Sequence, residues 1–445
     1  MDLNGKKIGV LGFGVVGKSV LGCIKQFTDK IEILDQNKIN EPGIYQNPDL
    51  ENFLEVNDFI IPSPGIDLRN YYRNYKGKFI FEIDLFYHFF NYPTSKKIIA
   101  LTGTIGKTSV VNLIHQLFNN LSTQYKVGLG GNVGIAMLDL LKDDIDIALL
   151  EISSFQLEHA NNFAPDLAIW TNFFPNHLDR HGSLNEYFLA KFNLIKYQNV
   201  NQKALIPLNL IEKIRESKPK AQLFFFAENL DHEKLKLLTK DESLFFIEDG
   251  FVKLMSHNSV KKLFDINNFP KISFLENWLI IYAAFYLEGI ELKKENFEYD
   301  FKIPEHRLEK FTEFNGATFY NDSKSTVIES TLNAIKKLKS KNLILILGGL
   351  SKGADRSILI KECVGKVKKI YLFGKEAENL QHFCDIYKMD SYKSETLEQV
   401  VENLFLDLKN GDEVLFSPAG SSYDLFKNYE ERGKAFKDLV FKKLS

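Results

Sequence analysis

The sequence predicts a three-domain α/β protein in which mostly parallel sheets carry the functional residues. Its 445 residues correspond to roughly three domains of about 150 residues each. Short apolar runs alternate with helical patterns, which is typical of α/β units with a parallel sheet. Glycine-rich or polar segments follow several of these runs, and the carboxyl ends of parallel strands are where such sheets bind ligands.

Composition limits the possible partners. The formal net charge of −2 gives no extended positive field, so we expect a small-molecule substrate and neither nucleic acid nor a membrane as partner. The N-terminus runs straight into a strand-like segment, and no stretch approaches the ~20 apolar residues that span a bilayer, so we expect a cytoplasmic protein. Cys23, Cys363 and Cys384 show no CxxC spacing, and we expect them to be buried apolar residues.

Residues 1–92 are expected to form the first domain, a Rossmann-like sheet. The loop Gly12-Phe-Gly14-Val-Val-Gly17 matches GxGxxG between a strand and a helix, and Asp35 closes the next strand. Taken alone, this pattern suits an NAD-dependent dehydrogenase as well as a loop whose glycines only serve a tight turn and close helix packing.

Residues 93–302 are expected to form a central ATPase-type domain. The segment GTIGKTS, residues 103–109, lies between an apolar strand and a helical pattern, where backbone N–H groups can surround phosphates. Lys107 would add a positive charge, and the Thr108 hydroxyl could bind Mg²⁺. Because a hydride-transfer enzyme has no need of an ATP site, the first glycine loop is better interpreted as holding a nucleotide part of the substrate.

The sequence pattern predicts a small β-rich insertion within the central domain and a third domain after it. Residues 203–262 contain short strands with turns. Residues 303–445 contain apolar strands at NLILILGG, KIYLFGK and EVLFSPAG, and the segment FKIPEHR links them to the centre. The third domain is therefore expected to be a Rossmann-like α/β domain.

Several polar side chains follow these predicted strands. Glu151 could hold Mg²⁺, although the serines after it could equally cap a helix. His177 could act as a ligand or a base, or make only a loop hydrogen bond. Arg307 and Lys324 suit a phosphoryl group in transfer, and surface ion pairs are their alternative. The segments around Lys352 and residues 417–424 suit a small anionic substrate.

The motifs GTIGKTS, GGNVG, EISSFQLE, NHLDRHGS, EHR, NDSK and SPAGSSYDLFKNYEERG occur in an order that resembles the Mur ligase family over the whole chain. The N-terminal GFGVVGKS with Asp35, SPGI at residues 63–66 and the C-terminal motif are most similar to members that add D-glutamate to UDP-N-acetylmuramoyl-L-alanine. This resemblance implies ATP-dependent amide-bond formation through an acyl phosphate, in peptidoglycan precursor synthesis. It also implies a UDP-sugar domain, an ATP domain and an amino-acid domain, in that order.

The resemblance implies a role for each matched position. The uridine and diphosphate site comprises Val15, Val16, Asp35, Gln36 and Gly65. The ATP site comprises Gly103, Thr104, Gly106, Lys107, Thr108, Ser109, Asn277, Arg307 and Asp322. The muramoyl-alanine end meets Asn132 and Ser153. One Mg²⁺ lies on Thr108 and Glu151, and a second on His177 and Lys191. The D-glutamate site comprises Lys324, Thr326, Lys352, Ser422, Tyr423 and Tyr429. The catalytic set comprises Lys107, Glu151, His177, Lys191, Arg307 and Lys324.

An unmodified ammonium cannot bind Mg²⁺, because it has no lone pair. We therefore expect Lys191 to be carbamylated, which would turn the cation into an anion with two oxygens, and its alternative is an ordinary ion pair. The chain departs from the family pattern at Ile105, where Asn is usual, and at Val327, Tyr423 and Tyr429. It also departs at Phe274, Glu276 and Ile280, so the adenine site must be remodelled.

Two other functions remain open: a folylpolyglutamate-synthase-like ligase, which would lack such an N-terminal domain, and a non-catalytic UDP-sugar sensor. We expect an active monomer.

Overall fold

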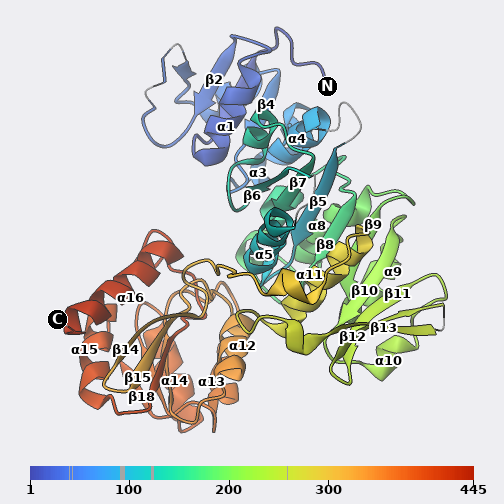
Figure 1. The fold of residues 1–445 in the computed structure, drawn as a ribbon. Helices are drawn as coiled ribbons and strands as arrows, with labels where there is room; N and C mark the ends of the chain where they lie inside the picture. The colour runs from blue at the N-terminus through green and yellow to red at the C-terminus, as the bar shows by residue number, and fades with distance from the viewer. Residues whose placement is uncertain (40, 43, 91–95, 122–124, 258, 445) are drawn as a thin grey trace. The chain divides into compact units, whose positions relative to one another are not determined.

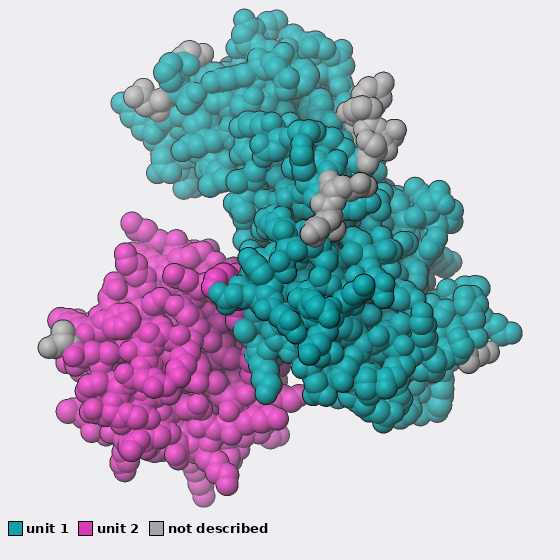
Figure 2. Space-filling model, viewed as in Figure 1, with its two compact units in different colours: residues 1–173, 185–301 teal, residues 174–184, 302–445 magenta. Residues whose placement is uncertain are grey.

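The computed structural model describes residues 1–39, 41–42, 44–90, 96–121, 125–257 and 259–444. The chain forms two compact units (Figure 2). Unit 1 comprises residues 1–173 and 185–301, and unit 2 comprises residues 174–184 and 302–445. The expected boundary between residues 92 and 93 lies outside the described residues, so the three-domain division stays a prediction.

The N-terminal part of unit 1, coloured blue in Figure 1, contains a four-stranded sheet. Its strands are parallel and lie in the order β3-β2-β1-β4. Its strands are β1 (Ile8–Leu11), β2 (Ile31–Leu34), β3 (Tyr45–Gln46) and β4 (Phe59–Pro62). Its helices are α1 (Val15–Ile24), α2 (Leu50–Val56), α3 (Arg69–Tyr75) and α4 (Glu82–Phe90). Because these strands are parallel, the glycine loop after β1 and Asp35 after β2 lie at the same edge.

The centre of unit 1 is a nine-stranded sheet in the order β13-β12-β11-β10-β9-β8-β5-β7-β6. Its strands are β5 (Lys97–Thr102), β6 (Val127–Gly131), β7 (Ile147–Glu151), β8 (Leu167–Trp170), β9 (Lys203–Pro207), β10 (Gln222–Ala227), β11 (Ser243–Glu248), β12 (Phe251–Ser256) and β13 (Ser259–Asp265). Among the described residues, β12 pairs antiparallel with both β11 and β13, and the other strand pairs of this sheet are parallel. The β-rich segment expected over residues 203–262 is present, and its strands extend the central sheet.

Helices cover both faces of this central sheet. They are α5 (Lys107–Asn120), α6 (Ser154–Leu157), α8 (Leu184–Lys196), α9 (Ile211–Glu216), α10 (His232–Leu235) and α11 (Leu275–Leu287). Ile98 and Ala100 of β5 face one core and Ile99 and Leu101 the other, which explains the continuous apolar run of this strand.

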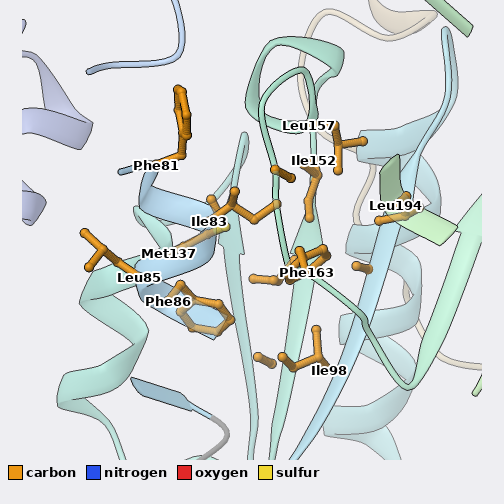
Figure 3. Close-up of a cluster of buried hydrophobic side chains, with 14 of the residues drawn as sticks. Phe81, Ile83, Leu85, Phe86, Ile98, Met137, Ile152, Leu157, Phe163 and Leu194 are labelled. Atoms are coloured by element: carbon orange, nitrogen blue, oxygen red, sulfur yellow. The ribbon is translucent and has the colours of Figure 1, made fainter. Parts of the chain in front are cut away.

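Helix α4 joins the N-terminal part of unit 1 to its centre. Figure 3 shows side chains of α4, among them Ile83 and Phe86, in one cluster with Met137, Ile152 and Phe163. All five are at most 2% exposed. The two sheets of unit 1 therefore share a hydrophobic core.

Unit 2 is built on a six-stranded sheet in the order β14-β15-β19-β16-β17-β18, parallel except for the edge strand β14. Its strands are β14 (Glu309–Phe314), β15 (Ala317–Asn321), β16 (Leu343–Leu347), β17 (Lys369–Leu372), β18 (Ser391–Lys393) and β19 (Glu413–Phe416). Its helices are α7 (Leu178–His181), α12 (Ile328–Leu338), α13 (Ser357–Cys363), α14 (Ala377–Ile386), α15 (Leu397–Asp407) and α16 (Tyr429–Leu444).

The three cysteines are buried free thiols, as expected. No helix in the described part of the chain is both long and apolar enough to cross a membrane.

Candidate active site

The N-terminal glycine loop is a tight connection between β1 and α1. A Cβ on Gly17 would collide with the carbonyl oxygen of Gly12, whose φ is +85°. The Asp35 carboxylate accepts the backbone N–H of Phe13 at 2.6 Å and that of Asn37 at 2.8 Å. Desolvation would raise the pKa of Asp35, but these hydrogen bonds lower it on balance. Asp35 thus holds the loop, in addition to any ligand that it contacts.

The other residues expected at the uridine and diphosphate site lie near the same edge. Val15 is 74% exposed at the start of α1. Gln36 and Gly65 are also exposed, and Val16 is half-buried. These positions leave the edge accessible to a ligand.

The expected phosphate loop connects β5 to the first turn of α5. Gly106 has a φ of +82° and precedes the helix, and a Cβ on Gly103 would collide with the Thr171 hydroxyl. Thr108 is 2% exposed in the first helical turn, beside the half-buried Ser109. Because the first N–H groups of a helix have no partner within the helix, this loop can surround phosphate oxygens.

Asn172, at the carboxyl end of β8, fixes the middle of this loop. Its side chain accepts the N–H of Ile105 at 2.9 Å and donates to the carbonyl of the same residue at 3.0 Å. It also accepts the N–H of Thr104 at 3.2 Å. The Thr104 hydroxyl lies 3.2 Å from that of Tyr187. The loop is therefore held through the backbone of Ile105, the position at which the resemblance implies Asn.

Two lysines converge on one carbonyl of the loop. Lys107 Nζ donates to Gly103 O at 2.8 Å, and Lys191 Nζ donates to the same oxygen at 2.7 Å. Lys191 is only 1% exposed. Burial, reinforced by the charge of Lys107 and opposed by Glu151, holds the pKa of Lys191 well below its usual value.

Glu151 lies beside the phosphate loop, because Leu101 of β5 pairs with it across the sheet. It is 2% exposed, and its Oε1 accepts a hydrogen bond from Asn132 Nδ2 at 2.8 Å. Ser153 caps α6 in a reciprocal arrangement with Gln156. The helix cap that was the alternative role of the serines is thus present. It does not involve the Glu151 carboxylate, which lies at the end of β7.

Asn277, in the first turn of α11, lies next to the phosphate loop. Its Oδ1 would stand 3.3 Å from a Cβ on Gly106. Its Nδ2 donates to Ser273 Oγ at 2.9 Å. Of the nearby departures from the family pattern, Ile280 is fully buried in the core, whereas Phe274 is 37% exposed. The structure thus brings Asn277 to the loop where the resemblance places ATP.

His177 is not in the same unit as Lys191. It lies in the segment of residues 174–184, which belongs to unit 2, and has the left-handed φ of 55° before α7. The second Mg²⁺ site on these two residues therefore stays a prediction.

In unit 2, Asp322 joins its own loop after β15 to the loop after β19 and to the segment that precedes β14. Its carboxylate accepts Ser325 Oγ at 2.6 Å, Ser417 Oγ at 2.7 Å and the N–H of Leu308 at 3.0 Å. Desolvation raises its pKa to about 6, against these hydrogen bonds and the charge of the half-buried Arg307. Asp322 therefore holds the EHR segment that carries Arg307.

Lys324 and Tyr429 lie together, with Lys324 Nζ 4.9 Å from the centre of the Tyr429 ring. Thr326 is half-buried just before α12. Val327 is the N-cap residue of that helix and provides no side-chain cap. A lysine, a hydroxyl and an aromatic ring expected around D-glutamate thus lie in or beside one loop.

The loops after β16 and β19 pair through reciprocal backbone hydrogen bonds of 2.9 Å between Leu350 and Ser421. Lys352 lies in the first loop with a φ of 53°, and Ser422 in the second is 3% exposed. Tyr423 is 71% exposed. The loops expected to hold D-glutamate are therefore joined at their backbones.

Sequence reasoning missed three residues that hold these loops, namely the half-buried Asn172 and the buried Arg356 and Arg432. Arg356 and Arg432 are 3% and 0% exposed and donate to loop carbonyls. Asn172 and Arg432 fall within or beside the quoted motifs, but a single polar residue carries no pattern that shows whether it is buried or which loop it contacts.

Residues 101–266 match the Mur ligase middle domain, and residues 306–420 match the Mur ligase glutamate ligase domain. UDP-N-acetylmuramoylalanine--D-glutamate ligase of Thermoanaerobacter sp. (strain X514) is 33% identical over 99% of both chains. The ligase of the same name from Natranaerobius thermophilus is 33% identical over 99% of this chain and 98% of its own.

Solved structures agree in fold. The MurF ligase from Thermotoga maritima in complex with ADP covers 99% of this chain and 95% of its own, at 16% identity and a TM-score of 0.59. E. coli FolC in complex with ADP covers 82% of this chain and 94% of its own, at 12% identity and a TM-score of 0.56. The full-length similarity to curated D-glutamate ligases distinguishes the chain from the FolC type, and the chain belongs to the Mur ligase family.

Proposed function

We propose that this chain joins D-glutamate to UDP-N-acetylmuramoyl-L-alanine at the expense of ATP, in the cytoplasmic synthesis of peptidoglycan precursors. The similarity to ligases of that name, which extends along 99% of the chain, carries this proposal. The phosphate loop held by Asn172, with Lys107 and Asn277 beside it, supports ATP as the nucleotide.

The reaction needs activation because a carboxylate is a poor electrophile. ATP phosphorylates the free carboxylate of UDP-N-acetylmuramoyl-L-alanine, and the amine of D-glutamate then attacks the acyl phosphate and expels phosphate. Lys107, with Arg307 and Lys324 of unit 2, would offset the charge that spreads over the phosphoryl group. Exclusion of water from the reacting groups would protect the acyl phosphate from hydrolysis.

The donors beside the phosphate loop suit Mg²⁺. The Thr108 hydroxyl and the Glu151 carboxylate are buried oxygen groups on neighbouring elements, and oxygen ligands are what Mg²⁺ prefers. Bound there, the ion would neutralise phosphate charge. We also propose a second Mg²⁺ on His177 and carbamylated Lys191.

The carbamate proposal rests on the surroundings of Lys191. Burial lowers its pKa and so leaves a neutral amine that can add carbon dioxide. The alternative is an unmodified amine that only supports the loop through Gly103 O. ¹³C NMR with labelled bicarbonate should show a carbamate signal that is lost in Lys191→Ala. Lys191→Arg, which cannot carry a carbamate, should be nearly inactive. An active arginine variant and no carbamate signal would establish the alternative.

A coupled assay tests the function directly. ADP release should require both UDP-N-acetylmuramoyl-L-alanine and an amino acid, with D-glutamate best among D- and L-amino acids. Better turnover with L-glutamate or D-lysine would contradict the specificity. Calorimetry should show binding of the UDP-sugar and none of NAD, and tight NAD binding would contradict the role of the N-terminal loop. Light scattering tests our expectation of a monomer.

A further inference from the structure

One buried arginine of α16 contacts three loops at the carboxyl edge of the unit 2 sheet. Arg432 Nε donates to Ser323 Oγ at 3.0 Å and its Nη2 to Ser323 O at 2.6 Å, in the loop after β15. Its Nη1 donates to Gly420 O at 2.8 Å, in the loop after β19. A Cβ on Gly349, in the loop after β16, would stand 2.9 Å from the same nitrogen.

Burying this guanidinium has an unfavourable desolvation free energy, so stability alone does not explain it. Arg432 is 0% exposed, and in the described part of the chain it forms no ion pair with a carboxylate. Desolvation lowers its pKa to about 9. The charges of Asp424 and Asp322 oppose this shift without cancelling it, and the hydrogen bonds of the guanidinium go to neutral oxygens, so the burial of this cation is only partly compensated. The planar guanidinium can instead orient the loops, because it donates hydrogen bonds to several acceptors in fixed directions.

The contacted loops carry the residues expected to meet the amino acid. Lys324 directly follows Ser323, and Ser422 lies two residues after Gly420. We propose that Arg432 is a positioning residue, which holds Lys324 and Ser422 in their binding geometry before the amino acid arrives. This proposal rests on the proposed function and adds to it a determinant of amino-acid affinity.

A second buried arginine shows what is particular to Arg432. Arg356 donates to Pro418 O at 2.7 Å and Gly348 O at 3.1 Å, and lies 3.5 Å from the Glu376 carboxylate. It thus joins the loops after β16 and β19. Of the two arginines, Arg432 alone is hydrogen-bonded to the Ser323 loop that leads into Lys324.

The test compares Arg432→Met, which keeps most of the volume but no donor, with Arg432→Lys and a matched control. The control is Lys437→Met on the same helix, because Lys437 pairs with Glu309 at 2.6 Å and contacts none of these loops through a hydrogen bond. In the full-length protein without substrates, residues 321–326 and 417–424 should exchange amide hydrogens at least about tenfold faster in Arg432→Met and at the normal rate in the control.

Kinetics give the second measurement. The KM for D-glutamate should rise roughly tenfold or more in Arg432→Met and partly recover in Arg432→Lys, because small displacements of binding groups have large effects. ATP binding by calorimetry should stay within about twofold of wild type. Unchanged amide exchange together with an unchanged KM for D-glutamate would overturn the proposal. Equal losses of affinity for D-glutamate and for ATP would also overturn it.

If Arg432→Met does not fold, Arg432→Lys decides by the same two measurements, and normal values would overturn the proposal. If the wild-type chain ligates no amino acid, the proposed function fails, and hydrogen exchange alone tests whether Arg432 positions the loops.

Discussion

Individual side chains at the candidate site are held by contacts that also define their chemistry. Lys107 donates to two carbonyls of its own loop, Gly103 O at 2.8 Å and Thr104 O at 3.2 Å. A bound phosphate would offer the same ammonium a charged acceptor, and charge-assisted hydrogen bonds are roughly twice as strong as neutral ones. The lysine is thus placed to exchange loop carbonyls for phosphate oxygens.

Replacing Lys107 with Ala should abolish measurable turnover, because the contact is expected to contribute about 2–4 kcal/mol to the transition state. The matched control is Lys97→Ala at the start of β5, where the lysine pairs with Glu288 at 2.8 Å and remains accessible to solvent. The control should keep its activity. Steady-state rates of ADP release check both variants, and near-normal turnover of Lys107→Ala would remove the phosphate-loop assignment.

Asp322 gives unit 2 a pH dependence whose sign follows from burial. Desolvation raises its pKa from 3.8 to about 6, so the folded state binds this proton more tightly than the unfolded chain does. The contribution of this group to stability is therefore fully present below pH ~4 and decreases as the pH rises to about 6.

In Asp322→Asn this contribution is absent. As the pH rises from about 4 to about 6, the unfolding free energy of the wild type should fall relative to that of the variant. Above that range the difference between the two should stay constant. Denaturant unfolding at a series of pH values, monitored in unit 2, measures it. A difference that is constant with pH would show that Asp322 ionises in the folded state as it does in the unfolded chain.

At the scale of elements, local patterns predicted much of the architecture. The apolar strands at residues 97–102, 343–347 and 413–416 and the glycine loops after them are where the sequence indicated. The order of the strands in each sheet could not be predicted from the sequence, because strand pairing joins segments that are far apart in the chain. For this reason residues 203–262 were expected to be a small β-rich insertion, since nothing in their sequence shows that β9 pairs with β8.

The site was predictable to the same extent. Residues within glycine-rich loops could be named because phosphate binding requires a recognisable spacing. Asn172 and Arg432 could not, because their hydrogen bonds join segments that are far apart in the chain. The role of Asp35 in holding Phe13 was likewise invisible, since an acid at a strand end suits a ligand equally well.

The close approach of α1 to the first glycine loop gives a matched pair of substitutions. Gly17→Ala should destabilise unit 1 by about 1–3 kcal/mol, because the added methyl group meets the fixed carbonyl oxygen of Gly12. Gly14→Ala should cost less than about 1 kcal/mol, since its φ is −77° and nothing lies within 4 Å of the new atom. Chemical denaturation measures both, and equal effects would contradict the packing argument.

At the scale of the whole molecule, the distribution of cores determines which parts unfold together. Residues of α4 and of the central sheet belong to one cluster, so the two sheets of unit 1 depend on each other. The cores of unit 2 contain only residues of unit 2. We therefore expect calorimetry to resolve two unfolding transitions, one for each unit.

Reciprocal substitutions in the two cores assign these transitions. Phe86 of α4 is 0% exposed in the shared core of unit 1. Phe436 of α16 in unit 2 is also 0% exposed, and its ring stacks on that of Phe416 with 4.3 Å between the ring centres. Each change to Ala removes a buried ring and should cost about 3–5 kcal/mol. Phe86→Ala should lower the melting temperature of one transition and Phe436→Ala that of the other. If both variants shifted a single transition equally, the two units would unfold as one. If Phe86→Ala produced a third transition, the N-terminal sheet would unfold on its own, and the shared core would not couple it to the centre.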